Sequence, residues 1–200
     1  MEDESEIQLV VGLGNPGSQY EKTRHNVGFW LVNALVEKYQ GNIKHEAKFK
    51  GLFGAVNISE HECKLLVPLT FMNLSGEAVR KVASFYKIPP ESILVIHDEL
   101  DFPPGDVRLK KGGGANSHNG VQNIIDQLGS NNFLRMRLGI GKPSFKADMI
   151  NYVTSSPNKS ETKQIHEAID RAIEVIPDLI SGDFAKAVQT LHSQDLDDRS

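Results

Sequence analysis

The chain has 200 residues, a formal net charge of -4 and a single cysteine, Cys63. A chain of this length predicts one domain that buries a full hydrophobic core without disulfide bridges. No apolar run approaches the roughly 18 residues of a membrane span, and no signal peptide is evident, which excludes membrane and secreted classes. We therefore expect a soluble protein of the reducing cytoplasm.

Segments with strand and helix periodicity alternate along the chain. We predict strands over 7–12, 52–58, 63–68, 92–98, 107–109 and 133–140, and helices over 27–39, 78–85, 121–128, 161–176 and 184–192. Pro177 should end or kink the helix that precedes it. Residues 1–6 and 195–200 should form loose tails around a single domain over 7–194. The alternation predicts an α/β fold, a single three-layer domain with a mixed, mostly parallel twisted sheet between helices.

The first strand runs into a long polar loop that contains Gly12, Gly14 and Gly17 in the spacing of a dinucleotide-binding fingerprint. Two residues argue against that function. Pro16 removes an N–H where a pyrophosphate would need one, and Glu37, at the distance of the ribose-binding acid, lies on the polar face of a helix. We therefore expect no nucleotide cofactor and interpret the loop as part of an active site.

Polar side chains follow the most apolar strands, and the carboxyl ends of neighbouring parallel strands meet at one edge of a sheet. Asn15, His25, Asn73 and Asp98 can therefore share a crevice, with Asn119 on a neighbouring loop. A histidine beside a carboxylate, without a reactive Ser or Cys in an elbow motif, indicates hydrolysis by activated water, with His25 as the base and Asp98 orienting it. The asparagines would hold a polar substrate. The alternative for each asparagine is to cap a helix or brace a turn.

The other histidines and the cysteine carry weaker signals. Strand alternation turns His97 to the face opposite Asp98, so we expect it to be packed or on the surface. A metal site from His97, Asp98, Asp101 and His118 is an alternative, but ligand spacing such as H-E-x-x-H is absent and no metal is expected. Cys63 begins an apolar run and is expected in the core.

The segment 108–142 is basic although the whole chain is acidic. Six positive residues stand against Asp126, which gives the segment a net charge of +5. The six are Arg108, Lys110, Lys111, Arg135, Arg137 and Lys142. Alternation over 133–140 places Arg135 and Arg137 on one face of a strand. The segment is either a solvated surface or a confined phosphate-binding site on an otherwise acidic protein.

Five motifs occur in an order and spacing that resemble those of the bacterial-type peptidyl-tRNA hydrolases. They are GLGNPGSQYEKTRHNVGF, PLTFMNLSGEAV, ILVIHDELDFPPGDVRLKKGGG, SHNG and RMRLGIGKP. The resemblance covers nearly all of Val10 to Pro143, and the C-terminal helices agree more loosely. It implies an enzyme that cleaves the ester between a peptide and the 3' ribose of tRNA without a metal or cofactor. We accordingly expect a cytoplasmic monomer with no obligate protein partner.

The resemblance also implies roles for individual residues. It makes His25 the base and Asp98 its partner. Asn15, Asn73 and Asn119 would hold substrate and water, Tyr20, Met72 and His118 would line the cleft, and Lys110 and Arg137 would clamp the 5' phosphate of the tRNA. The sequence departs from the family's pattern at Asn116 and Ser117, where the family usually has two glycines. Asparagine tolerates a positive φ, and serine does so less readily.

The alternative function is a noncatalytic RNA-binding module on the same fold. Such a module would keep the basic clamp and would have no need of a histidine that activates water. The presence of both His25 and Asp98 favours the enzyme.

Overall fold

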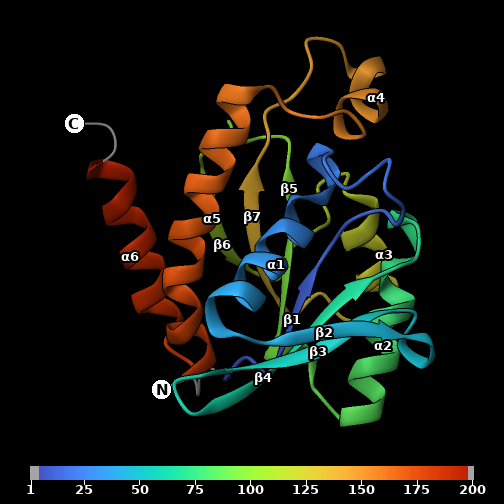
Figure 1. The fold of residues 1–200 in the computed structure, drawn as a ribbon, viewed down its shortest axis with the longest axis vertical. Helices are drawn as coiled ribbons and strands as arrows, with labels where there is room; N and C mark the ends of the chain where they lie inside the picture. The colour runs from blue at the N-terminus through green and yellow to red at the C-terminus, as the bar shows by residue number, and fades with distance from the viewer. Residues whose placement is uncertain (1–4, 198–200) are drawn as a thin grey trace.

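The structure, a computed structural model, describes residues 5–197 and is built on a seven-stranded sheet (Figure 1). The strands are β1 (Leu9–Gly12), β2 (Asn42–Glu46), β3 (Gly51–Ile58), β4 (His61–Pro68), β5 (Ile93–Glu99), β6 (Val107–Lys111) and β7 (Leu134–Gly139). Their order across the sheet is β2-β3-β4-β1-β5-β7-β6. Residues 1–4 and 198–200, which belong to the predicted tails over 1–6 and 195–200, lie outside the described residues.

Parallel pairing is confined to the centre of the sheet. β4, β1, β5 and β7 pair in parallel, whereas the β2-β3, β3-β4 and β6-β7 pairs are antiparallel. Five of the seven strands therefore run in the same direction, which confirms the mixed, mostly parallel sheet. Because β1 lies between β4 and β5, the loops that follow these three strands meet at one edge, as predicted.

One strand, β2, has no counterpart among the predicted strands. Its sequence, NIKHE, is polar and largely exposed, and only Ile43 packs against the core. β2 is therefore a strand because it pairs with β3, and the pattern of its own side chains does not predict it.

Helices cover both faces of the sheet. They are α1 (Val27–Tyr39), α2 (Ser75–Tyr86), α3 (Asn119–Leu128), α4 (Met149–Val153), α5 (Lys159–Ile180) and α6 (Phe184–Asp197). Figure 1 shows α1 and α5 in front of the sheet with α6 beside α5, and α2 and α3 on the other side, while the short α4 lies above the carboxyl edge of the strands. This arrangement confirms the three-layer α/β domain.

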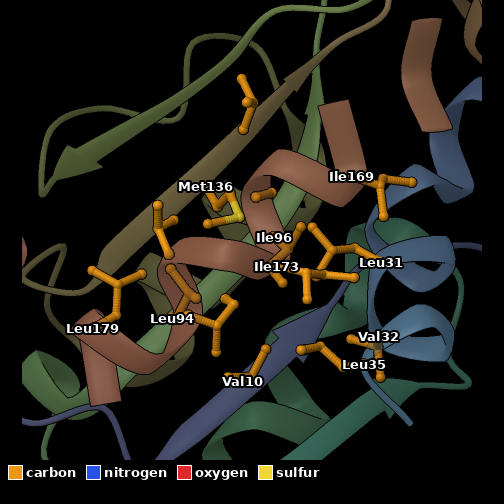
Figure 2. Close-up of a cluster of buried hydrophobic side chains, with 14 of the residues drawn as sticks. Val10, Leu31, Val32, Leu35, Leu94, Ile96, Met136, Ile169, Ile173 and Leu179 are labelled. Carbon is orange, nitrogen blue, oxygen red and sulfur yellow. The ribbon is translucent and has the colours of Figure 1, made fainter. Parts of the chain in front are cut away.

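Alternate side chains of the central strands build a core on each face. On one face Val10 and Ile96 pack in a cluster with Ile173 of α5 and side chains of α1 (Figure 2). On the other face Val11 and Val95 join the inner sides of α2 and α3. Each fully buried aliphatic side chain contributes roughly 1.5–3 kcal/mol, so these strands form a rigid base for the loops at their carboxyl ends.

The C-terminal helices extend further than the sequence pattern predicts. Pro177 lies inside α5, which continues to Ile180, so of the two predicted outcomes the end of the helix at Pro177 is wrong, and a kink there stays a prediction. Leu179 and Ile180 are buried, and their packing holds this last turn although proline removes one backbone donor. α6 likewise continues to Asp197, into the segment predicted to be loose. Within residues 5–197, no helix combines the length and apolar character that a bilayer crossing requires.

Candidate active site

The first loop, residues 13–26, leads from β1 to α1 and is fixed by side-chain amides. Asn26 is buried, accepts a hydrogen bond from the Asn15 N–H at 2.9 Å and donates from Nδ2 to the Asn15 carbonyl at 3.0 Å. Gly14 lies against this pair, since a Cβ there would approach Asn26 Cγ to 2.9 Å. The N–H of Leu13 also bonds to the carbonyl of Ile96 in β5, at 3.1 Å. The backbone that leads to His25 is therefore held in place by the fold itself.

His25 lies in a short 3-10 helix, Arg24–Asn26, directly before α1 and faces the end of β5. Its Nδ1 is 2.8 Å from Asp98 Oδ2, so the predicted pair is in hydrogen-bond contact. Burial lowers the pKa of His25, but the charge of Asp98 and the hydrogen bond to it raise it, and the net pKa is raised above the ordinary 6.5. With Nδ1 held by Asp98, Nε2 is the nitrogen that can take a proton.

His118 occupies the other oxygen of the same carboxylate. Its Nε2 is 2.7 Å from Asp98 Oδ1, and its Nδ1 accepts the backbone N–H groups of Gly120 and Val121 at 3.2 and 3.3 Å. Because backbone N–H groups only donate, Nδ1 carries no proton and Nε2–H donates to Asp98. His118 therefore caps α3 and fixes Asp98 at the same time.

Asp98 is held as a carboxylate by these two histidines. Burial alone would raise the pKa of Asp98, but its electrostatic interactions and hydrogen bonds with His25 and His118 hold that pKa well below its usual range. An ionised Asp98 can keep the tautomer of His25 and can stabilise the imidazolium that forms when His25 takes a proton.

His97 is packed on the opposite face, as predicted, and takes no direct part in this pair. Its Nδ1 donates to the Asp98 carbonyl at 2.7 Å, and its Nε2 accepts the Nε–H of Arg135 at 3.1 Å. Burial, with the nearby His118 and Arg135, lowers the pKa of His97 well below 6.5, so the ring is neutral. His97 therefore connects the end of β5 to Arg135 as a structural residue.

Within residues 5–197, the group that could hold a metal is His25, Asp98 and His118, whose nearest ligand atoms lie within 4.8 Å of one another. Two ligands on one ion at about 2.1 Å would be about 3.0–3.4 Å apart in octahedral or tetrahedral geometry. The observed contacts of 2.7 and 2.8 Å are shorter and fit hydrogen bonds. This donor set differs from the alternative weighed from the sequence, since His97 and Asp101 are not part of it.

The second loop, residues 112–118, closes one side of the cleft. Asn116 and Ser117 both have left-handed backbone, with φ of 49° and 67°. Both residues line a cavity of about 170 Å³, together with His25, Asp98, His118, Asn119 and side chains of α4. The loop that departs from the family's glycine pattern is thus part of the wall beside the predicted base.

The other predicted substrate residues lie on the first loop and directly before α2. Asn15 Oδ1 accepts the N–H of Met72 at 2.8 Å, which leaves its Nδ2 as the group that can bind a substrate. Met72 is buried, and its sulfur lies close to the position that a Cβ on Gly120 would take, 2.6 Å from it. Asn73 is exposed and Tyr20 half-buried. None of these four lines the cavity itself.

The predicted phosphate residues lie on β6 and β7. Arg108 pairs with Arg137 and Lys110 with Arg135 across the strands, so all four cations share one face. The guanidinium groups of Arg108 and Arg137 lie 4.4 and 4.9 Å from the ring centroid of Phe102. Arg137 Nε is buried without a hydrogen-bond partner among the described residues. Arg135 is fully buried against His97, so the inclusion of its charge in a phosphate-facing segment is wrong.

Arg24 is a supporting residue that the sequence does not reveal. It is buried and donates to the Tyr152 carbonyl at 3.2 Å, to Ser155 Oγ at 2.6 Å and to Glu161 Oε1 at 3.2 Å. These contacts join the short helix that carries His25 to α4 and to the start of α5. An arginine beside a candidate base is a weak signal, and its partners lie more than a hundred residues further along the chain.

A buried carboxylate that orients a histidine beside a cleft, at the carboxyl edge of parallel strands, is the arrangement of an enzyme that activates water. The family model described as peptidyl-tRNA hydrolase matches residues 9–199. The peptidyl-tRNA hydrolase of Methylobacillus flagellatus is 52% identical over 188 residues, which are 94% of this chain and 97% of the relative. That of Halorhodospira halophila is 50% identical over 190 residues, 95% of this chain and 98% of the relative.

Comparison with solved structures indicates the same family as comparison of the sequences. A crystal structure of peptidyl-tRNA hydrolase from Acinetobacter baumannii matches with a TM-score of 0.90 and 44% identity, covering 92% of this chain and 94% of that chain. The chain belongs to the peptidyl-tRNA hydrolase family, as its motifs predict.

Proposed function

We propose that this protein hydrolyses the ester bond between the peptide and the 3' ribose of peptidyl-tRNA, releasing free tRNA and peptide. Membership of the family supports the substrate. The observation that carries the mechanism is the contact of 2.8 Å between His25 Nδ1 and Asp98 Oδ2 at the wall of a cleft.

In this mechanism His25 Nε2 removes a proton from water while the water oxygen attacks the ester carbonyl carbon. Asp98 stabilises the imidazolium, and the same histidine then returns the proton to the leaving ribose oxygen. The asparagines donate neutral hydrogen bonds, which bind the developing oxyanion or the peptide without burying another charge. Asn15 Nδ2 is suited to this role because Asn15 Oδ1 is already held by Met72.

The tRNA is held through its phosphates by Lys110 and Arg137. Two features support this assignment: the two side chains share a face of the β6-β7 pair, and the buried Nε of Arg137 has no hydrogen-bond partner within residues 5–197. A terminal phosphate would accept from both groups. Asn73, Asn119, Tyr20, Met72 and His118 complete the substrate site. We expect the enzyme to act in the cytoplasm as a monomer, without a protein partner.

The experiment that tests this function is incubation of the protein with a peptidyl-tRNA and, separately, with an N-unblocked aminoacyl-tRNA, followed by measurement of free tRNA. Cleavage of the peptidyl-tRNA supports the proposal. Binding without cleavage at stoichiometric protein would instead support the noncatalytic RNA-binding module.

A further inference from the structure

One side chain of the second loop, that of Asn116, forms hydrogen bonds to two residues outside the loop. Asn116 Nδ2 donates one hydrogen to Glu99 Oε1 at 2.8 Å and the other to Asp101 Oδ2 at 2.7 Å. Glu99 is the buried last residue of β5, one position after Asp98, and Asp101 is exposed two positions further on. A single amide nitrogen therefore bridges two carboxylates at the end of the strand that carries Asp98.

The rest of this loop has few other attachments. Arg135 Nη1 donates to the Gly114 carbonyl at 2.6 Å, and the N–H of Gly112 bonds to the carbonyl of Phe133 at 3.1 Å. The loop opens with three glycines, which leave the backbone many conformations when it is not held. Between Gly114 and His118, Ala115 is buried in the core beside α3, and Asn116 is the only residue whose side chain forms a hydrogen bond among the described residues.

The loop ends in groups that face the cleft. Ser117 lines the cavity directly before His118, so the path of the backbone at Asn116 sets where Ser117 lies. The hydrogen bond from His118 to Asp98 and the capping bonds that His118 accepts do not involve Asn116. Movement of the loop at Asn116 would thus alter the substrate side of the cleft and leave the pair of His25 and Asp98 in place.

We propose that Asn116 is a positioning residue for the reaction, whose amide fixes the second loop against the end of β5 and so holds the cleft wall at Asn116 and Ser117 ready for substrate. The inference rests on the proposed function of the cleft. Without the bridge, substrate binding has to order the loop, so affinity falls while proton transfer within the bound complex continues. Asn116 itself acts through its neighbours and need not contact the reacting atoms.

The test compares Asn116→Gly with Ser117→Gly. Both variants place a glycine at a left-handed position and add the same backbone freedom, but only Asn116 makes a side-chain hydrogen bond among the described residues. We expect Asn116→Gly to raise KM for peptidyl-tRNA about tenfold, equivalent to about 1.4 kcal/mol, with kcat and its pH profile unchanged. Ser117→Gly should raise KM less than Asn116→Gly does, because it removes a side chain from the cleft wall but no hydrogen bond that holds the loop.

Two further variants separate the amide from the backbone. Asn116→Asp preserves size and tolerance of the left-handed backbone but replaces the donor by a third carboxylate, so KM should rise more than in Asn116→Gly. Asp101→Ala removes one acceptor at an exposed position where folding is not at risk, and should raise KM less. The salt dependence of affinity should match the wild type in Asn116→Gly and Ser117→Gly, because neither substitution changes a charge or a phosphate contact.

An equal rise in KM for Asn116→Gly and Ser117→Gly would overturn the inference, because backbone freedom alone would then explain the effect. Unchanged KM in both Asn116 variants, with active wild type, would overturn it as well and leave the proposed function standing. A wild-type protein that cleaves no peptidyl-tRNA would instead remove the proposed function and this inference together.

Discussion

The first loop (13–26) and the second loop (112–118) border the same cleft, but they are held in place by different means. The first loop is packed: Asn26 is buried, its amide bonds to both backbone groups of Asn15, and Gly14 has no room for a side chain. The second loop is more open: Ala115 is buried, but Asn116 and Ser117 are exposed, and a Cβ on Gly114 would have no heavy atom within 4 Å.

This difference in packing fits different tasks for the two loops. The first loop carries His25, whose distance to Asp98 has to be preserved for proton transfer, so dense packing is an advantage. The second loop carries groups that face the cleft, and the polar anchor at Asn116 holds its exposed backbone in place for a substrate. Changes in the first loop should therefore lower kcat, and changes in or next to the second should raise KM.

The largest effect is expected for His25→Ala in the first loop. Loss of the general base should lower kcat by about 10²-fold to 10⁴-fold, while binding of peptidyl-tRNA persists, because the imidazole acts on water and not on phosphate. Single-turnover hydrolysis and a filter-binding assay measure the two quantities. His61→Ala, at the exposed start of β4, is the matched control and should retain wild-type rates. A variant without His25 that keeps the wild-type rate would place the base elsewhere.

A smaller effect is expected on the free energy of unfolding, which should change by different amounts when the same substitution is made in each loop. In Gly14→Ala the new Cβ would lie 2.9 Å from Asn26 Cγ, so the Asn26 amide that braces the loop has to move. We therefore expect the free energy of unfolding to fall by about 1–3 kcal/mol and kcat to be lower. The same substitution in the second loop, Gly114→Ala, should change stability by less than about 1 kcal/mol. Urea unfolding of both variants measures the difference. Equal losses would show that the two loops are equally packed.

The smallest effect on chemistry is expected at the β6-β7 pair, of which β6 leads into the second loop. Lys110→Ala or Arg137→Ala should raise KM with unchanged kcat and should flatten the slope of log affinity against log salt by about one unit. A small substrate, a blocked amino acid esterified to a short 3' oligonucleotide without the 5' phosphate, should be indifferent to both changes. Lys163→Ala, on the opposite face in α5, is the control. Unchanged KM at every salt concentration would place the tRNA elsewhere.

The pair of His25 and Asp98 is predictable from the sequence because both residues follow apolar strands whose carboxyl ends meet at one edge. The second interaction of Asp98 is not predictable in this way. His118 reaches it as the N-cap of α3, a position for which Ser, Thr, Asp and Asn are the usual signals. The bracing role of Asn26 is hidden for a similar reason, since its partner depends on the path of a loop with no periodicity.

Counting charges along the sequence does not predict the burial of Arg135, and side-chain periodicity does not predict the strand β2. Arg135 adds to the net charge of its segment, but its guanidinium is buried against His97, because a count along the chain contains no information on burial. β2 is polar and becomes a strand through its partner β3, a non-local contact that the pattern of five residues cannot express. Both findings depend on tertiary packing.

The most direct test of the central claim is the pH dependence of the single-turnover rate in the wild type and in Asp98→Asn. The base has to be neutral to accept a proton, so the wild-type rate should rise with pH and level off above an inflection higher than 6.5, because Asp98 raises the pKa of His25. Asp98→Asn removes that charge and leaves the lowering effect of burial, so the inflection should move to lower pH and the plateau should fall, although less than in His25→Ala. An inflection that stays at the wild-type pH in Asp98→Asn would contradict the account, because the titrating base would then not be a histidine held by Asp98.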